Sequence, residues 1–517
     1  MAFLPRPDTK QEPSSVAELS LAAAGQPAAR AATGIAGLDD VLTGGFVRDR
    51  LYLVEGTPGT GKTTLALQFL LEGARAGERC LYVTMSETAG ELGDGAASHG
   101  WTLDGIEVFE LVPPKSLLDE RQQQSLLYSS DLELDEATRA VFATVERVRP
   151  QRVVLDSLSE IRLLAQGGLR YRRQVLALKH YFARHNATVL MLDDMTADPL
   201  DKTVHSLAHG VLRLEELAPD YGPERRRLRV IKYRGTAFRG GNHDFTIATG
   251  GLRLFPRLVA AEHRLGFHRD LMSSGIAELD ALLGGGLERG TSALLLGPAG
   301  TGKSLLGLYF ATTAISRGEK VLICVFDEEI GLLIDRAKAL GFDLEALQAS
   351  GKLILEQVDA AAISPGEFAH NVRAHVEAGV RTVVVDSLNG YQAAMPGEQY
   401  LVLHMHELLQ YLNRRAVSTF LTVAQHGLVG DMRSPVDVTY LADTVILLRY
   451  FEALGRMRRA LSVVKKRAGG HEDTVREFRI GADGLRLGQP LEEFQGVLRG
   501  VPIYVGKGGP LLGPMPE

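Results

Sequence analysis

The sequence LYLVEGTPGTGKT at residues 51–63 determines the expected fold, because an apolar run leads into a glycine-rich loop that opens a helical pattern. The loop fits G-x-x-x-x-G-K-[ST], in which glycines let backbone N–H groups converge on phosphates and the lysine neutralises them. A second copy, LLGPAGTGKS at residues 295–304, has the same context. The predicted phosphate-binding residues are Gly56, Thr57, Pro58, Gly59, Thr60, Gly61, Lys62, Thr63 and Thr64, and Gly297, Pro298, Ala299, Gly300, Thr301, Gly302, Lys303, Ser304 and Leu305.

The two loops belong to a tandem duplication. TGIAGLDDVLTGG at residues 33–45 reappears as SGIAELDALLGGG at residues 274–286, an offset of 241 (274 − 33). Lys62 and Lys303 keep the same offset (303 − 62), so two unrelated motifs share one register and indicate duplication of a whole domain. The expected organisation is a disordered leader at residues 1–30, a first domain at 31–258, a second domain at 259–500 and a flexible tail at 501–517.

Short apolar runs alternate with helical segments within each half. In the first half these runs cover residues 51–54, 80–83, 153–155, 188–192 and 228–231. Alternation of this kind predicts the α/β class, with a mostly parallel sheet covered by helices on both faces.

The composition excludes several classes of protein. With 57 basic and 63 acidic residues the net charge is −6, which gives no bulk attraction to nucleic acid. The two cysteines lie inside apolar runs, which favours a reduced, cytoplasmic protein and leaves no sulfur framework for zinc. No run approaches the ~18 apolar residues of a membrane span, and the N-terminus has no signal-peptide core. We therefore expect a cytoplasmic protein, with neither nucleic acid nor a membrane as its default partner.

Each half has an apolar run that ends in an acid, RVVLDS at 152–157 and TVVVDS at 382–387. A carboxylate at the end of a parallel strand beside a phosphate loop can hold magnesium through water. Mg²⁺ is therefore predicted on Asp156 with Thr63, and on Asp386 with Ser304. The alternative is an aspartate that caps a helix.

A further run in each half ends in acids, VTMSE at 83–87 and VFDEE at 325–329. A carboxylate near the γ-phosphate can orient or deprotonate the attacking hydroxyl, which makes Glu87, Glu328 and Glu329 candidate catalytic residues. Ser86 stands where the first acid of a pair is expected. The alternative is a pair of solvated glutamates at a strand end.

Basic residues alternate late in each half, in IKYR at 231–234 and VKKR at 464–467. On a strand, this spacing places Lys232 with Arg234, and Lys465 with Arg467, on one face that can clamp a phosphate. Presented to a neighbouring subunit, such pairs would complete its site. The alternative is a solvated edge strand.

This ordered set of motifs resembles the KaiC family of RecA-like ATPases, and the resemblance runs from about Thr33 to Pro502. It implies two tandem RecA-like P-loop domains in a double-ring homohexamer. ATP with Mg²⁺ would lie at the subunit interfaces of both rings, with slow hydrolysis chiefly in the first ring and serine/threonine autophosphorylation in the second.

The resemblance also implies roles for single residues. Glu87 would be the remaining activating acid of the first ring, Glu328 and Glu329 the acids of the second, and the two basic pairs would act from the neighbouring subunit. Counting back from Asp443 places the phosphoacceptor pair on Thr439 and Tyr440. The resemblance also implies a KaiB-like partner. The Gly/Pro-rich tail after Pro502 is unlike the family's KaiA-binding tail, so a KaiA-like partner is not expected.

The function that we expect is that of a hexameric, self-phosphorylating ATPase acting as a clock or signalling timer. Two other functions fit the same motifs. One is a RecA/RadA/DnaB-like DNA-acting ATPase, which the net charge and the absence of a basic tail disfavour. The other is an ATP-locked scaffold with little turnover.

Overall fold

The computed structural model describes residues 29–111, 126–165, 167–195, 203–218, 222–263, 266–359, 361–393, 401–425, 439–481, 484–499 and 502–505. Most of the predicted leader and tail, residues 1–28 and 506–517, therefore lie outside the described residues. The chain divides into two compact units, Met1–Glu215 with Arg229–Gly240 and Ile247–Arg253, and Glu216–Leu228 with Gly241–Thr246 and Leu254–Glu517.

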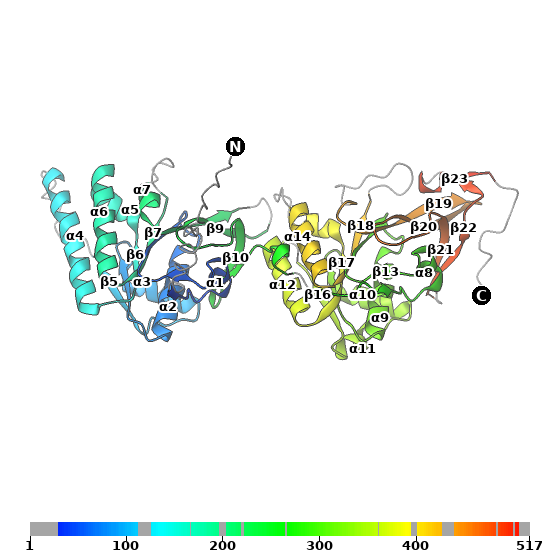
Figure 1. Cartoon of the computed structure of the whole chain (residues 1–517), viewed down its shortest axis with the longest axis horizontal. Coiled ribbons are helices and arrows are strands. Elements are labelled where there is room, and N and C mark those ends of the chain that lie inside the picture. Colours follow the sequence, from blue (N-terminus) through cyan, green and yellow to red (C-terminus); the bar gives the residue numbers. More distant parts are fainter. Residues whose placement is uncertain are drawn as a thin grey trace, which may run out of the picture. The chain divides into compact units, whose positions relative to one another are not determined.

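The first half is built on a nine-stranded sheet in the order β11-β10-β9-β8-β3-β7-β6-β4-β5 (Figure 1). Its strands are β3 Leu51–Glu55, β4 Cys80–Thr84, β5 Ile106–Glu110, β6 Arg152–Asp156, β7 Thr188–Asp193, β8 Gly210–Leu217, β9 Arg225–Tyr233, β10 Asn242–Ala248 and β11 Gly251–Phe255. β3 pairs in parallel with β7 and β8, and β6, β4 and β5 continue the parallel part. The phosphate loop thus follows a central strand.

The second half repeats this topology strand for strand, in the order β16-β15-β17-β18-β14-β19-β20-β21-β22 read from the other edge. Its strands are β14 Ser292–Gly297, β15 Lys320–Val325, β16 Leu353–Gln357, β17 Val380–Asp386, β18 Ser418–Ala424, β19 Thr444–Ala453, β20 Arg456–Lys466, β21 Val475–Gly481 and β22 Gly484–Pro490. β14 to β19 are parallel, whereas β19 to β22 form an antiparallel extension.

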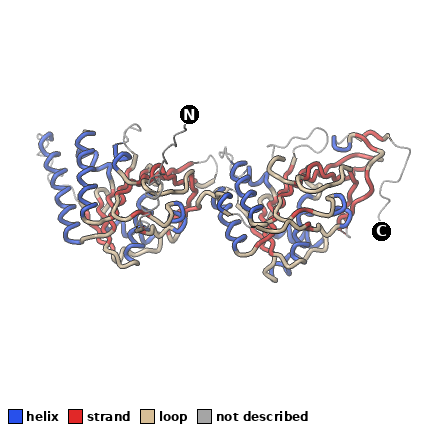
Figure 2. The backbone as a smooth tube through the Cα atoms, in the orientation of Figure 1, coloured by secondary structure: helices blue, strands red, loops and turns tan. Residues whose placement is uncertain are grey.

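Helices cover the strands in both halves (Figure 2). The first half contains α1 Ala36–Val41, α2 Lys62–Arg75, α3 Ala89–Ser98, α4 Leu126–Val148, α5 Leu158–Ala165, α6 Gly168–Arg184 and α7 Thr203–Leu207. The second contains α8 Ala277–Leu282, α9 Lys303–Ser316, α10 Ile330–Ala339, α11 Leu344–Ala349, α12 Pro365–Glu377, α13 Leu388–Ala393 and α14 Leu401–Arg414. No described helix is long and apolar enough to cross a membrane.

Short elements complete the described chain. They are β1 Arg30–Ala31 with β2 Phe46–Val47, β12 Leu271–Met272 with β13 Leu287–Glu288, β23 Phe494–Gln495 with β24 Ile503–Tyr504, and the 3-10 turns η3 Ala260–Glu262 and η4 Val497–Arg499.

Alternate residues of the central strand β14 enter opposite cores, as expected for a strand buried on both faces. Ala293 and Leu295 pack in one core with residues of α8, α9 and α10. Leu294 and Leu296 pack in the other with residues of α12 and α14. The predicted α/β class, a RecA-like sheet with helices on both faces, is confirmed.

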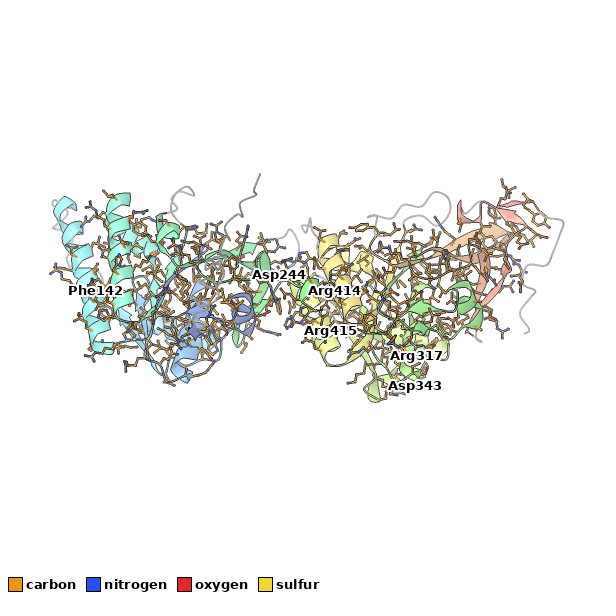
Figure 3. All side chains as sticks on the ribbon, in the orientation of Figure 1. Phe142, Asp244, Arg317, Asp343, Arg414 and Arg415 are labelled. Atoms are coloured by element: carbon orange, nitrogen blue, oxygen red, sulfur yellow. The ribbon has the colours of Figure 1, made fainter. Side chains whose placement is uncertain are left out.

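The repeated T-G-I motif has a structural role in both halves. The backbone N–H of Thr33 donates to Asp39 Oδ1 at 2.8 Å, and that of Ser274 donates to Asp280 Oδ1 at 2.7 Å. These bonds fix the turns that start α1 and α8. Side-chain caps are used elsewhere too, because Asp343, labelled in Figure 3, accepts from Ala346 N at the start of α11.

Candidate nucleotide-binding sites

The first phosphate loop joins β3 to α2 and contains two glycines at which a side chain would be strained or would clash. Gly61 has φ +94° and precedes the first residue of α2. A Cβ on Gly56 would lie 2.6 Å from the carbonyl oxygen of Leu214. The backbone N–H groups of the loop therefore lie at the start of a helix, where its dipole favours an anion.

The second phosphate loop repeats this geometry between β14 and α9. Gly302 has φ +106°, and a Cβ on Gly297 would lie 2.3 Å from the carbonyl oxygen of Leu448. Both halves thus carry the strand–loop–helix context that the sequence predicts for a triphosphate site.

The two lysines of the phosphate loops are buried, and each donates hydrogen bonds to carbonyl groups of its own loop. Lys62 Nζ donates to Gly56 O at 2.7 Å and pairs with Asp194 Oδ1 at 2.9 Å. Lys303 Nζ donates to Pro298 O at 2.7 Å. Burial lowers the pKa of Lys303 to about 8, although the nearby Asp386 carboxylate opposes the shift. The charge of Lys303 is therefore sensitive to mildly alkaline pH.

Asp156 ends β6 beside the first phosphate loop. Its Oδ2 accepts from the Tyr82 hydroxyl at 2.5 Å. Burial raises the pKa of the Asp156 carboxyl, and the Tyr82 hydroxyl, the Lys62 ammonium and the Thr63 hydroxyl oppose that effect. A carboxylate and a hydroxyl are the hard oxygen ligands that Mg²⁺ prefers, so Asp156 and Thr63 fit this ion.

Asp386 ends β17 in the corresponding place of the second half. Its Oδ1 accepts from the Thr422 hydroxyl at 2.5 Å. With Ser304, which follows Lys303 in α9, it supplies the same oxygen chemistry for Mg²⁺. Within the described ranges no group of three or more His, Cys, Asp or Glu side chains could hold a metal.

Glu87 follows β4 and lies close enough to Asp156 for the charges of the two carboxylates to interact. Its backbone N–H donates to Thr84 Oγ1 at 3.0 Å, which fixes the turn between β4 and α3. Burial raises the pKa of the Glu87 carboxyl, and the charges of Asp156, Glu91 and Asp194 raise it further. A carboxyl group with a raised pKa beside Asp156, the candidate magnesium ligand, is a candidate general base.

The acids of the second half occupy positions one residue away from those expected. Met85 N donates to Asp156 O, and Phe326 N donates to Asp386 O, so Met85 corresponds to Phe326. The residue that corresponds to Ser86 is therefore Asp327, and the alignment of Ser86 with the first glutamate of the pair is wrong by one residue.

The two glutamates of the second half make different contacts. Glu328 corresponds to Glu87 and pairs with Arg336 at 2.8 Å. Glu329 corresponds to Thr88 and accepts from Leu332 N, so it caps α10. Asp327, which sequence reasoning missed, accepts a hydrogen bond from the Ser387 hydroxyl. Asp327 is identified by the register in which β4 pairs with β6 and β15 pairs with β17.

Each basic pair donates hydrogen bonds to the backbone carbonyl groups of one turn in its own half. Lys232 Nζ donates to Ala208 O at 2.8 Å and to His205 O, while Arg234 donates to Ser206 O at 2.9 Å. These carbonyls end α7, so the predicted common face of the pair is present.

The second half repeats this arrangement. Lys465 Nζ donates to Thr439 O and Ala442 O, both at 2.8 Å, and Arg467 donates to Tyr440 O at 3.0 Å. The candidate phosphoacceptors Thr439 and Tyr440 therefore lie in a turn held by the basic pair. Thr439 is partly buried, whereas Tyr440 is 48% exposed.

One connection in the first half was not foreseen from the sequence. Glu55, the last residue before the phosphate loop, is 4% exposed and lies 2.7 Å from both His205 Nε2 and Arg213. Because Lys232 binds the carbonyl of His205, Glu55 and Lys232 contact the same residue. Leu296 takes the place of Glu55 in the second half, so the connection is specific to the first.

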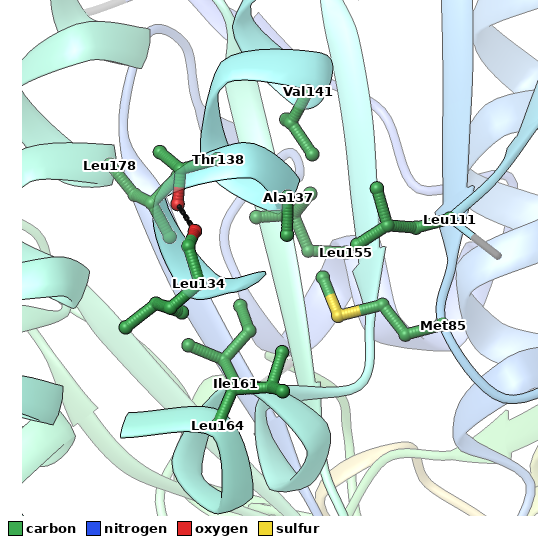
Figure 4. A pocket seen from close by; sticks show the side chains of 10 residues that line it. All are labelled: Met85, Leu111, Leu134, Ala137, Thr138, Val141, Leu155, Ile161, Leu164 and Leu178. Carbon is green, nitrogen blue, oxygen red and sulfur yellow. Dashed lines mark hydrogen bonds between the residues drawn. The ribbon is translucent and has the colours of Figure 1, made fainter. Parts of the chain in front are cut away.

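An apolar gap lies behind the first site, between α4, α5, α6 and Met85 (Figure 4). Its volume is about 20 Å³, enough for about one water molecule. The hydroxyl of Thr138, the polar side chain of the lining, already donates to Leu134 O at 2.7 Å. We interpret this gap as a packing defect.

Two phosphate loops on parallel sheets, each with a carboxylate at the end of a neighbouring strand, define a tandem RecA-like P-loop protein. Comparison with known families agrees with this class. The model of the family described as "ATPase: KaiC" matches residues 31–259 and again residues 272–492. The chain therefore belongs to the KaiC family of ATPases, for which ATP is the implied ligand.

Characterised relatives are similar over nearly the whole chain. The circadian clock protein KaiC3 of Synechocystis is 28% identical over 497 residues, covering 91% of this chain and 94% of that protein. The circadian clock oscillator protein KaiC of Acaryochloris marina is 26% identical, covering 92% and 91%. That of Synechococcus elongatus is 27% identical, covering 93% of each.

Proposed function

We propose that the chain is a clock or signalling timer that binds and hydrolyses ATP as a double-ring homohexamer. Each phosphate loop would hold the triphosphate, with Mg²⁺ on Thr63 and Asp156 in the first half and on Ser304 and Asp386 in the second. When bound, Mg²⁺ neutralises charge on the phosphates. The observation that carries the proposal is the pair of glycine loops, each with a buried lysine and a neighbouring strand-end carboxylate.

The positions of the basic pairs support ATP binding between subunits. Arg234 N donates to His209 O, and His209 N donates to Leu51 O, at the start of β3. The phosphate loop begins after Glu55, at the other end, and the four steps from Leu51 to Glu55 span about 13 Å. An arginine side chain does not cover that distance, so phosphates that reach Arg234 would belong to a neighbouring subunit.

Hydrolysis in the first half would use Glu87 as the base. A water oxygen attacks the γ-phosphorus, the bond from that phosphorus to the ADP oxygen breaks, and Glu87 takes the proton of the water. Lys232 and Arg234 of the neighbouring subunit would stabilise the charge of the transferred group.

In the second half the acceptor would be the hydroxyl of Thr439. Its oxygen attacks the γ-phosphorus of ATP held by the neighbouring subunit, ADP leaves, and Glu328 takes the proton. Tyr440 carries its hydroxyl further from the backbone and is the weaker candidate. The placement of Thr439 in the turn bound by Lys465 supports this assignment, because the turn is held by the pair that would face the neighbour's nucleotide.

Assembly in the presence of ATP tests the first part of the proposal. Light scattering after size exclusion should give the mass of a hexamer when ATP and Mg²⁺ are added. Lys62→Ala should weaken assembly, whereas Lys338→Ala, at an exposed site on α10, should not. A chain that stays monomeric at saturating ATP contradicts the subunit-interface sites.

Phosphopeptide mapping after incubation with ATP tests the second part. Label on Thr439 that is lost in Thr439→Ala and in Glu328→Gln supports the autokinase. Protein without label leaves an ATPase alone, and the absence of turnover as well leaves an ATP-locked scaffold. Salt-dependent DNA binding would favour the recombinase-like function instead.

The names of the relatives guide the choice of partner. Because they are circadian clock proteins, we propose a KaiB-like protein as the partner to test first. No KaiA-like partner is proposed.

A further inference from the structure

A cationic pocket lies in the first half at the end of β3 that is remote from its phosphate loop. Its volume is about 240 Å³. Its lining residues are Asp49, Arg50, Leu51, Lys179, Phe182, Ala183, Ala187, His209 and Arg234. Two arginines, a lysine and a histidine thus face one carboxylate, across walls that include apolar side chains.

The cations of this pocket have no carboxylate partner among the described residues. Lys179 Nζ donates to Leu207 O at 2.9 Å, Arg50 to Asp49 O at 3.0 Å and Arg234 to Ser206 O at 2.9 Å. All three acceptors are neutral carbonyl groups, so the carboxylate of Asp49 is what offsets part of the positive charge of the lining. The charge of this pocket is therefore available to an anion.

The electrostatics of neighbouring groups agree with this accumulation of charge. Burial lowers the pKa of Lys179, and the charges of Arg234 and Arg50 lower it further. Burial and the same two arginines also lower the pKa of His209. His209 Nε2 is buried and has no hydrogen-bond partner among the described residues. An anion in the pocket would relieve the repulsion among these groups.

The second half provides an internal comparison at the same positions. Asp443 N donates to Ser292 O and Arg467 N donates to Asp443 O, as His209 and Arg234 do in the first half, so Asp443 corresponds to His209. Arg467 pairs with Asp443 at 3.4 Å, which neutralises its charge.

The other two cations are also missing from the second half. Thr291 precedes β14 as Arg50 precedes β3. Val417 N donates to Leu412 O as Ala187 N donates to Phe182 O, so Leu409 corresponds to Lys179. Leu409 is 2% exposed in an apolar core. The set of Arg50, Lys179 and His209 is therefore specific to the first half, whereas the pocket beside Asp443 in the second half is lined by Arg269 and Arg414.

We propose that this pocket binds a phosphate chain and that Arg50, Lys179 and His209 join Arg234 in holding it. If the phosphate chain belongs to the ATP bound by a neighbouring subunit, the site rests on the proposed function. It then makes the first-half interface bind more tightly than the second-half interface. A free polyphosphate in solution has the same chemistry and is the other source.

Binding of inorganic triphosphate to the monomeric Lys62→Ala/Lys303→Ala chain tests the site itself. With both phosphate loops disabled, calorimetry should show one site per chain whose affinity falls at raised salt. Lys179→Met keeps the aliphatic stem and should weaken binding at least tenfold, as should Arg50→Gln at an exposed position. Lys179→Arg should restore binding. Arg184→Gln, which removes an exposed cation from the same helix, is the matched control and should leave binding unchanged.

A second experiment identifies the source of the phosphate chain. In the chain with intact phosphate loops, Lys179→Met should raise the ATP concentration needed for assembly several-fold if the neighbour's ATP is the ligand. If assembly is unchanged while triphosphate binding is lost, the ligand is a free polyphosphate. Absence of triphosphate binding to the monomer, or binding that Lys179→Met and Arg50→Gln leave intact, overturns the proposal whether or not the chain forms a hexamer.

Discussion

Glu87 is a carboxylate whose environment suits proton transfer, because burial and the charge of Asp156 both raise its pKa. Glu87→Gln keeps the shape of the side chain but cannot accept the proton. We expect ATP turnover to fall roughly 100-fold or more, the range for loss of a general base, while ATP-dependent assembly persists. The wild-type rate should also fall at low pH, starting above the pH at which an ordinary glutamate is protonated.

Turnover and assembly can be measured on the same preparation. Glu107→Gln, on β5 and paired with Arg147, is the control acid. Unchanged turnover in Glu87→Gln would show that the base is another group.

Lys303 makes the second site sensitive to alkaline pH. Its pKa of about 8 means that the ammonium is largely charged at pH 7 and largely neutral at pH 9. A neutral amine does not attract phosphate, so ATP affinity in a Lys62→Ala background should fall about tenfold between these pH values. Equilibrium binding of a fluorescent ATP analogue measures the change. Lys303→Arg stays charged and should remove the pH dependence; a dependence that survives this substitution refutes the explanation.

At the scale of the element, the turn after β15 gives the adjacent residues Glu328 and Glu329 different contacts and therefore different expected roles. Glu329 caps α10, so Glu329→Ala should lower the free energy of unfolding by about 1 kcal/mol, whereas Glu329→Gln keeps an accepting oxygen and should cost less. Both should retain label on Thr439. Glu328→Gln should lose the label with little change in stability, since its ion pair with Arg336 is partly exposed to solvent and contributes little.

Thermal unfolding and phosphopeptide mapping on the same three variants separate these roles. Loss of label in Glu329→Gln would show that this carboxylate takes part in the chemistry.

Local patterns predicted much of the fold. The runs at 51–54 and 188–192 became β3 and β7, because a buried parallel strand has a continuous apolar signature. β5 (Ile106–Glu110) is only partly buried and has a weaker signature, and no expected run covered it. No expected run covered β8 (Gly210–Leu217) either, although this strand lies beside the central β3 and its first three residues are buried.

The phosphate loops could be predicted because their chemistry is carried by contiguous residues. The remaining parts of the site depend on the register between distant segments. Asp327 was missed because the sequence shows two neighbouring glutamates and gives no sign that Glu329 starts a helix. Lys179 was missed because one lysine on an amphipathic helix resembles any solvated cation until α6 is packed beside Arg50.

At the scale of the whole molecule, the two halves share one strand order but have diverged in spacing. The offset is 241 at the phosphate loops (303 − 62) and 233 at the basic pairs (467 − 234). Since the strand order is unchanged, the difference was absorbed in connecting segments, where changes in length are tolerated. The two sheets thus kept one topology, while the residues around the starts of β3 and β14 became chemically different.

The hydrogen bond between Glu55 and His205 gives the proposed ring a route for cooperativity. Glu55 adjoins the phosphate loop of its own subunit, and His205 carries the carbonyl bound by Lys232, which would face the next subunit's nucleotide. Occupancy of one site can then bias the next around the ring, and the Hill coefficient for ATP turnover should exceed 1. His205→Leu should bring it towards 1 without abolishing assembly. A coefficient unaffected by this substitution would mean that subunits communicate elsewhere.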